Sequence, residues 1–196
     1  AGYINTLIER LALSHPEISF RFINQNQTKL HTSGNGNLKD VIYHIYGRDI
    51  TANLIEVDAG EVSCQVKGFI GKPVVSRGNR NYMNYFINGR YIKSSTIHKA
   101  IEDAYQPYTM QHRYPFTVLH FTVNPELVDI NVHPQKMEIR FSDAQGIYQS
   151  VYHAVSEALK YKEFIPEVTL QENSSERKAG GRNGSVGNTG GTFQKD

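Results

Sequence analysis

The chain has 196 residues, of which 39% are hydrophobic and 11% aromatic, which is enough apolar material for one sizeable core and an appendage. The formal net charge is only +2 and the one cysteine, Cys64, excludes an internal disulfide, while the eight histidines form no cluster with zinc-ligand spacing. Because no apolar run approaches the roughly 20 residues of a membrane span and the first residues lack a signal-peptide layout, we expect an intracellular protein that binds no metal by itself.

The first third of the chain predicts a helix, a hairpin and a second helix. Apolar residues recur at helical spacing over 4–11, with no capping segment before them, so we expect the chain to begin inside a helix whose upstream domain is missing. Alternation over 17–32 around a polar turn predicts a β-hairpin. The next helix has its apolar stripe over 38–45, with Asn37 as N-cap and Gly47 as a left-handed C-cap.

The central part of the chain is rich in strand signals. Two strands are predicted near 54–57 and 62–70, with 58–60 as the turn between them. The strongest hairpin signal is the pair Asn88 and Gly89, which follows a run of aromatic and β-branched residues. Both residues tolerate positive φ, so we predict a type I′ turn.

Helices and strands then alternate up to the end of the folded part. Ser94 or Ser95 caps a helix that ends before Pro107 and has an apolar stripe, its buried face, at Ile97, Ala100, Ile101 and Ala104. A strand follows over 116–123. Ser142 and Gln145 have the spacing of a capping box for a last helix that extends to about residue 159.

From about residue 166 the chain is poor in apolar residues and rich in Gly, Ser and Asn, which predicts a flexible linker. We therefore expect a folded domain over 1–162 and a disordered linker over 163–196. The mixture of hairpins and helices around one core predicts the α+β class.

Positive charge is concentrated in one segment, although the net charge is small. No Asp or Glu lies between Lys67 and Lys99, and the rest of the chain carries 14 positive against 19 negative residues. The positive residues of this acid-free segment are Lys67, Lys72, Arg77, Arg80, Arg90, Lys93 and Lys99. A solvated face explains such a run as well as an anionic partner does.

No self-contained active site is visible in the sequence. The glycines at 34 and 36 are not followed by the Lys-Ser or Lys-Thr of a phosphate-binding loop, and no G-x-S-x-G motif occurs. His133 is a possible base, but a histidine before a proline more often has a structural role. Lys136 stands apart because Pro134 stiffens the backbone before it, so its ammonium suits a phosphate clamp, although the pattern alone favours a solvated loop lysine.

Two segments together carry a family resemblance. "FINGRYIKSSTIHKAIEDAY" followed by "VDINVHPQKMEIRF" closely resembles the MutL family of DNA mismatch repair proteins, and the resemblance extends from about Tyr3 to Leu159. It implies the transducer domain, the second domain of the family's N-terminal ATPase region. The implied fold is a two-layer sandwich with helices on one face of a mixed sheet, as in gyrase and a ribosomal-protein domain. Its strand-helix-strand crossover would be left-handed, whereas general rules predict a right-handed one.

The resemblance also assigns residues. Lys136 matches the lysine that contacts the γ-phosphate of ATP bound in the preceding domain, and Asn131, His133 and Pro134 would support its loop. Arg90 and Lys93 match basic residues that bind DNA without sequence preference. Weaker candidates for DNA contacts are Lys99, Arg77 and Arg80. Ser95 stands where some relatives carry another basic residue, which implies weaker DNA binding here.

The resemblance therefore implies a non-enzymatic fragment of an ATPase. ATP and Mg²⁺ would be held mainly by the missing domain, and this domain would couple the ATP state to dimerisation of the parent and to binding of single- and double-stranded DNA. The implied partners are other repair proteins such as a MutS-type mismatch recogniser, in the bacterial cytoplasm at the nucleoid. One alternative is a stand-alone nucleic-acid-binding module without ATP coupling. A gyrase-like or Hsp90-like transducer is a third, weaker alternative.

Overall fold

The computed structural model describes residues 2–61, 64–129 and 138–164. In chain order its elements are α1 (Gly2–Ser14), β1 (Arg21–Asn24), β2 (Gln27–His31), α2 (Leu38–Tyr46), α3 (Arg48–Thr51), β3 (Leu54–Glu61), β4 (Cys64–Gly71), the 3₁₀ turns η1 (Pro73–Val75) and η2 (Arg80–Tyr82), β5 (Met83–Ile87), β6 (Arg90–Tyr91), α4 (Ser95–Tyr105), β7 (Thr117–Val123), η3 (Pro125–Leu127), β8 (Val128–Asp129), β9 (Arg140–Phe141) and α5 (Ala144–Phe164). The predicted linker over 163–196 lies outside the described residues from 165 onward, so its boundary stays a prediction.

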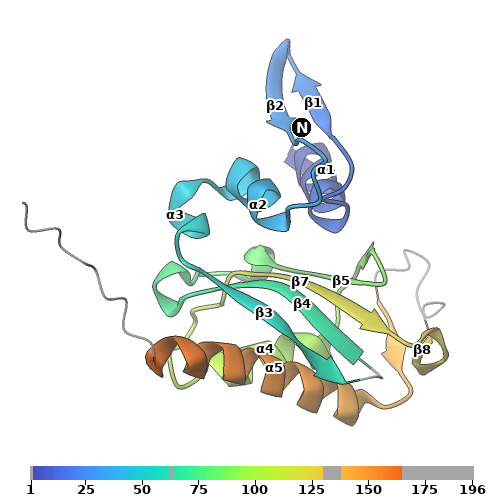
Figure 1. Cartoon of the computed structure of the whole chain (residues 1–196), viewed down its shortest axis with the longest axis vertical. Coiled ribbons are helices and arrows are strands. Elements are labelled where there is room, and N and C mark those ends of the chain that lie inside the picture. Colours follow the sequence, from blue (N-terminus) through green and yellow to red (C-terminus); the bar gives the residue numbers. More distant parts are fainter. Residues whose placement is uncertain (1, 62–63, 130–137, 165–196) are drawn as a thin grey trace, which may run out of the picture. The chain divides into compact units, whose positions relative to one another are not determined.

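A five-stranded mixed sheet forms the centre of the fold, in the order β3-β4-β7-β5-β6 (Figure 1). Neighbouring strands are antiparallel except β5 and β7, which are parallel and are connected through β6 and α4. The predicted α+β fold with a mixed sheet is confirmed. The hand of the connection between β5 and β7 stays a prediction.

Helices α4 and α5 lie side by side on one face of this sheet (Figure 1). The apolar stripe predicted for α4 is fully buried there, and α5 contributes Ile147, Val151, Val155 and Leu159 to the same core. Each Ile, Val or Leu side chain removed from water here contributes about 1.5–3 kcal/mol, so the pairing of α4 with α5 holds this layer on the sheet.

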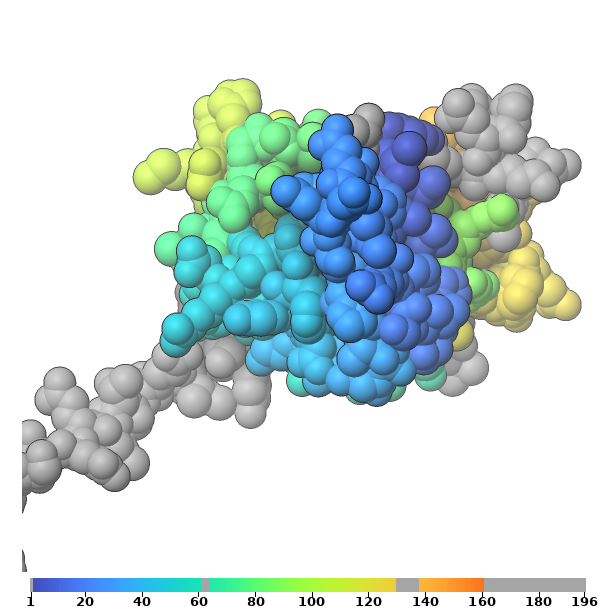
Figure 2. Space-filling model, turned by 90° about the horizontal axis from the view of Figure 1, so that it is seen from above, coloured from blue at the N-terminus to red at the C-terminus, as the bar shows by residue number. Residues whose placement is uncertain are grey.

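The opposite face of the sheet has a cover of its own, which the two-layer expectation did not include. Side chains of α1 and α2 pack with Leu30 of β2 against Phe86, Phe116 and Val118 of the sheet side. Figure 2 views the molecule from the side of these N-terminal elements, and their atoms, coloured blue to cyan, occupy the middle of the visible face. The separate hairpin β1–β2 belongs to this second layer.

The turn predicted at 58–60 is wrong. Asp58, Ala59 and Gly60 continue β3 and pair in register with Lys67, Val66 and Gln65 of β4. Gly60 has φ +136° inside the ladder, and a Cβ there would collide with the Cys64 carbonyl oxygen. Gly60 is therefore a glycine that the close approach of two strands requires, and not a turn glycine.

The N-caps predicted for α2 and α4 are confirmed, and the one predicted for α5 is wrong. Asn37 caps α2 by accepting from the Lys39 and Asp40 N–H groups, and Ser94 caps α4 by accepting from the Ile97 N–H, as predicted. The capping box of Ser142 with Gln145 is wrong by one residue. Asp143 caps α5, because its Oδ1 accepts from the Gly146 N–H at 2.8 Å and its carbonyl accepts from the Ile147 N–H.

Candidate nucleic-acid interface

The hairpin that carries Arg90 is fastened to the centre of the sheet. Asn88 and Gly89 both have positive φ, 48° and 78°, which confirms the predicted type I′ turn. The Asn88 side chain donates to the Val123 carbonyl at 3.0 Å and accepts from the Val123 N–H at 3.1 Å, so it acts as an extra strand partner for β7. Arg90, which is exposed, is thus presented from a fixed backbone.

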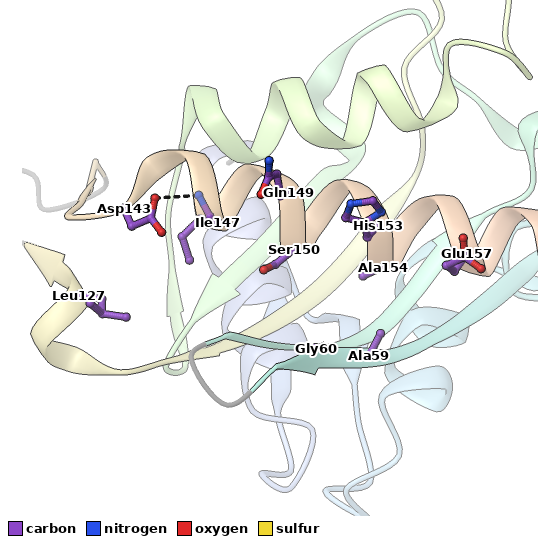
Figure 3. Close-up of a pocket in the computed structure, with 11 residues that line it drawn as sticks. Ala59, Gly60, Leu127, Asp143, Ile147, Gln149, Ser150, His153, Ala154 and Glu157 are labelled. Atoms are coloured by element: carbon purple, nitrogen blue, oxygen red, sulfur yellow. Dashed lines mark hydrogen bonds between the residues drawn. The ribbon is translucent and has the colours of Figure 1, made fainter.

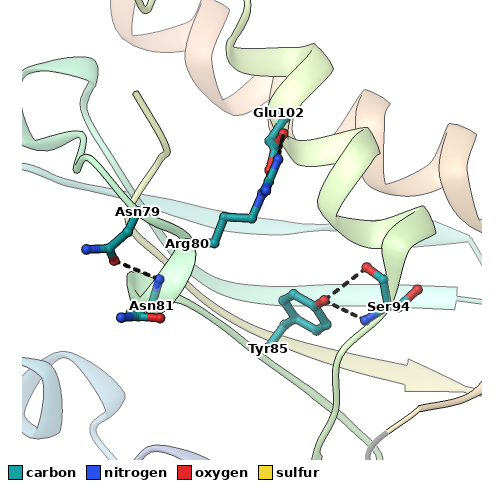
Figure 4. A network of polar contacts seen from close by, with 6 residues as sticks. All are labelled: Asn79, Arg80, Asn81, Tyr85, Ser94 and Glu102. Atoms are coloured by element: carbon teal, nitrogen blue, oxygen red, sulfur yellow. Dashed lines mark hydrogen bonds and ion pairs between the residues drawn. The ribbon is translucent and has the colours of Figure 1, made fainter. Parts of the chain in front are cut away.

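Lys93 also stands on a fixed backbone. The next residue, Ser94, donates its N–H to the buried Tyr85 hydroxyl at 2.7 Å, and that hydroxyl donates to the Ser94 carbonyl at 3.0 Å (Figure 4). Lys93 itself forms a parallel bridge with Glu138. The exposed ammonium of Lys93 therefore extends from a point where β6, α4 and the chain before β9 meet.

The other three predicted DNA contacts are engaged within the domain. The Arg80 guanidinium forms a two-pronged ion pair with Glu102, with Nε–Oε1 at 2.5 Å and Nη2–Oε2 at 3.0 Å (Figure 4). The same guanidinium stacks 4.5 Å over the Tyr114 ring. Lys99 pairs with Asp103 at 2.8 Å.

Arg77 is half-buried. Its backbone bonds to Tyr114 in both directions and its guanidinium lies 5.4 Å from the Tyr82 ring centre. Within the described residues, Arg90 and Lys93 are the members of the predicted DNA site that have neither an ion pair nor a stacking partner.

The structure adds Arg10 to the cations near the hairpin, which sequence reasoning missed. The Arg10 guanidinium of α1 lies 4.0 Å over the ring of Tyr91 in β6. A cavity of about 350 Å³ separates α1 from the hairpin, and Arg10, His15 and Arg90 all line it. Some 80 residues separate Arg10 from the hairpin, so no local motif indicated the contact.

His98 of α4 is half-buried, and its charged neighbours are Glu102, Arg80 and Lys93. Its ring contacts Tyr85 edge-on, with the centroids 5.2 Å apart. Burial lowers the pKa of His98 below its ordinary value, Glu102 acts in the opposite direction, and Arg80 and Lys93 lower the pKa further. An anion bound at Lys93 would reduce that last effect.

The predicted γ-phosphate contact and its three supporting residues fall in one segment of the chain. Lys136, Asn131, His133 and Pro134 all lie in 130–137, outside the described residues. On either side of this loop, Asp129 of β8 is paired with Arg140 of β9. Glu138, the first described residue after 130–137, forms a backbone bridge with Lys93.

Within the described ranges 2–61, 64–129 and 138–164, no three His, Cys, Asp or Glu side chains come together as a metal site. Burial raises the pKa of the Cys64 thiol to about 11, which keeps it protonated and unreactive. No helix in this part of the chain is both long enough and apolar enough to cross a membrane.

The fold and these side chains define an α+β domain with two unpaired cations on rigid backbone and no catalytic cluster among the described residues. The chain matches a family model described as "DNA mismatch repair protein, C-terminal domain" over residues 42–160. The chain thus belongs to the MutL family of DNA mismatch repair proteins.

Two relatives show how much of a family member this chain represents. It is 57% identical over 177 residues to the DNA mismatch repair protein MutL of Agathobacter rectalis, covering 90% of this chain and 27% of the relative. It is 37% identical over 173 residues to the MutL of Caldanaerobacter subterraneus subsp. tengcongensis, covering 88% and 29%. The chain spans little more than a quarter of either relative.

A solved structure supports the fold. The crystal structure of the N-terminal domain of a DNA repair protein superposes with a TM-score of 0.67 at 20% identity, covering 81% of this chain and 53% of that one.

Proposed function

We propose that this domain binds the DNA backbone without sequence preference, and that Arg90 and Lys93 make the contacts. The observation that carries the proposal is that neither side chain has a carboxylate partner among the described residues. Both are exposed cations on anchored backbone with no carboxylate partner in the described residues, whereas the cations of Arg80 and Lys99 are neutralised by Glu102 and Asp103. Free cations on a rigid base suit phosphates, because they neutralise charge and release counterions without reading bases.

We further propose that the parent protein couples this binding to ATP held elsewhere in its chain, with Lys136 as the γ-phosphate contact. Support comes from the family membership and from the backbone bridge between Lys93, a proposed DNA contact, and Glu138. Glu138 follows Lys136 by two residues in the sequence. A lysine suits this task because its ammonium is a flexible point charge that pairs with phosphate. Bound ATP with Mg²⁺ would supply the phosphate, and dimerisation and contacts with a MutS-type protein would follow in the parent.

The DNA proposal is tested by fluorescence anisotropy of labelled duplex and single-stranded DNA across a salt series. For duplex DNA the logarithm of affinity should fall with the logarithm of salt at about −0.9 per phosphate neutralised. The double variant Arg90→Glu/Lys93→Glu should lower affinity on any sequence and make the slope shallower by about 1.8, because two contacts are lost.

The matched control is Lys29→Glu/Arg48→Glu, which makes the same change in net charge at exposed positions on β2 and α3. If the control weakens binding as much as the test variant, net charge and not the hairpin explains the affinity. ATP coupling is tested separately in the full-length parent by Lys136→Met. Unchanged ATP dependence of DNA binding in this variant would contradict the role of Lys136, whereas DNA binding by the wild type that does not respond to ATP would favour the uncoupled nucleic-acid-binding module.

A further inference from the structure

The edge of the sheet farthest from the hairpin combines an open strand with a groove. β3 pairs with β4 on one side, and no other described strand pairs with it on the outer side. Between β3 and α5 lies a groove of about 520 Å³ (Figure 3). Ala59 and Gly60 of β3 line one wall, and Ile147, Ser150 and Ala154 of α5 line the other.

The two faces of β3 differ in chemistry. Ile55 and Val57 are buried beneath the helices, and the half-buried Ala59 continues this apolar row to the groove. Glu56 and Asp58 alternate with them and are exposed on the opposite face. Glu56 has no ion pair with a described residue, and Asp58 pairs with Lys67 on the inner neighbour β4 at 3.3 Å. An open strand edge offers N–H and C=O groups to any extended chain.

Charge decides which extended chain fits. Among the residues that line the groove there is no Lys or Arg, while Asp143 and Glu157 are acidic. Glu157 pairs with Lys160, which stands outside the groove lining. A second copy of β3 would bring Glu56 and Asp58 against the same carboxylates, and like charges directly opposite on neighbouring strands destabilise their pairing.

We propose that β3 and this groove dock an extended segment of a protein partner in which apolar and basic residues alternate. The segment adds a strand to β3, with its apolar side chains in the groove against α5 and its basic side chains beside Glu56 and Asp58. Backbone hydrogen bonds supply affinity in this mode of binding, and the alternate side chains supply specificity. The proposal concerns the sheet edge opposite the hairpin and does not depend on DNA binding.

The test uses the whole chain and two labelled peptides of the same eight-residue length as β3. One alternates Val with Lys and the other alternates Val with Glu, so both have the same strand propensity. Binding is followed by fluorescence anisotropy, and hydrogen exchange reports which amides become protected. We expect the Val-Lys peptide to bind, to slow exchange over 54–61, and to bind at least about fivefold more tightly than the Val-Glu peptide.

Three variants locate the contact. Glu56→Lys/Asp58→Lys should weaken the Val-Lys peptide at least about fivefold, because two favourable cross-strand pairs become repulsive. Ser150→Phe should also weaken it by filling the groove from the half-buried surface of α5. Asp49→Lys on α3, an exposed carboxylate that is not part of the groove, should have no effect. All four proteins are compared by urea unfolding, and the two charge variants change exposed residues only.

Equal binding of the two peptides, protection outside 54–61, or an Asp49→Lys effect as large as that of the β3 variant would overturn the proposal. Concentration-dependent dimerisation of the chain through the same amides would overturn it as well, since the edge would then belong to a second copy.

Discussion

At the scale of single residues, Asn88 does more than permit the turn that its sequence predicts. Its side-chain amide exchanges two hydrogen bonds with the Val123 backbone while its own backbone has φ +48°. The two roles make different demands, because any residue without this amide loses the bonds but only some residues are strained by positive φ. The hairpin of Arg90 therefore depends on this one side chain.

Replacing Asn88 separates the two roles. Asn88→Gly keeps the left-handed backbone and loses the bonds to Val123, so we expect the free energy of unfolding to fall by about 1–3 kcal/mol. Asn88→Ala loses the same bonds and adds the cost of positive φ, about 1 kcal/mol more. Urea unfolding at neutral pH measures both. Stability equal to that of the wild type in Asn88→Gly would mean that water replaces the amide at no cost.

At the scale of secondary-structure elements, the N-terminus of α5 depends on Asp143 and not on Ser142. Asp143→Ala removes the acceptor of the Gly146 N–H, and we expect a loss of about 1 kcal/mol. Asp143→Asn keeps an acceptor there and should restore most of that stability, and Ser142→Ala should change little. Chemical unfolding compares the three variants. A larger loss in Ser142→Ala than in Asp143→Ala would return the cap to Ser142.

Elements with a strong periodic or turn signal were predictable from the sequence. The buried face of α4, the turn at Asn88 and Gly89, and the cap at Asn37 all follow from local chemistry, which is the same in the folded and unfolded chain. The limits of β3 were not predictable, because a close approach to Cys64 demanded Gly60.

The charge pattern of the candidate site was also predictable only in part, because folding brings residues together that are apart in the sequence. The segment from Lys67 to Lys99 has no acid in sequence, but α4 places Glu102 beside Arg80 and Asp103 beside Lys99. Two of the five predicted contacts to DNA thus have internal partners that appear only when the helix is folded. Distance in space, not in sequence, decides which cations are available to DNA.

At the scale of the whole molecule, two half-buried imidazoles connect layers of the fold. The His120 ring of β7 is bonded through Nε2 to the Leu13 carbonyl of α1 at 3.0 Å, and Glu17 and His15 are the charged groups nearby. His98 of α4 packs on Tyr85 of the sheet, with Glu102, Arg80 and Lys93 around it. Burial is the main cause that lowers the pKa of both rings below the ordinary value of 6.5.

These two shifts predict acid sensitivity. A base whose pKa is lower in the folded protein binds fewer protons there than in the unfolded chain, so stability is complete above pH 6.5 and falls as pH drops through that value. We expect the free energy of unfolding to fall as the pH drops from 7.5 to 5.5. Burial raises the pKa of Glu9, which works in the opposite direction, so the decisive comparison is with variants. His98→Gln/His120→Gln should lose most of the pH dependence over this range, and a variant as acid-sensitive as the wild type would assign the effect to other groups.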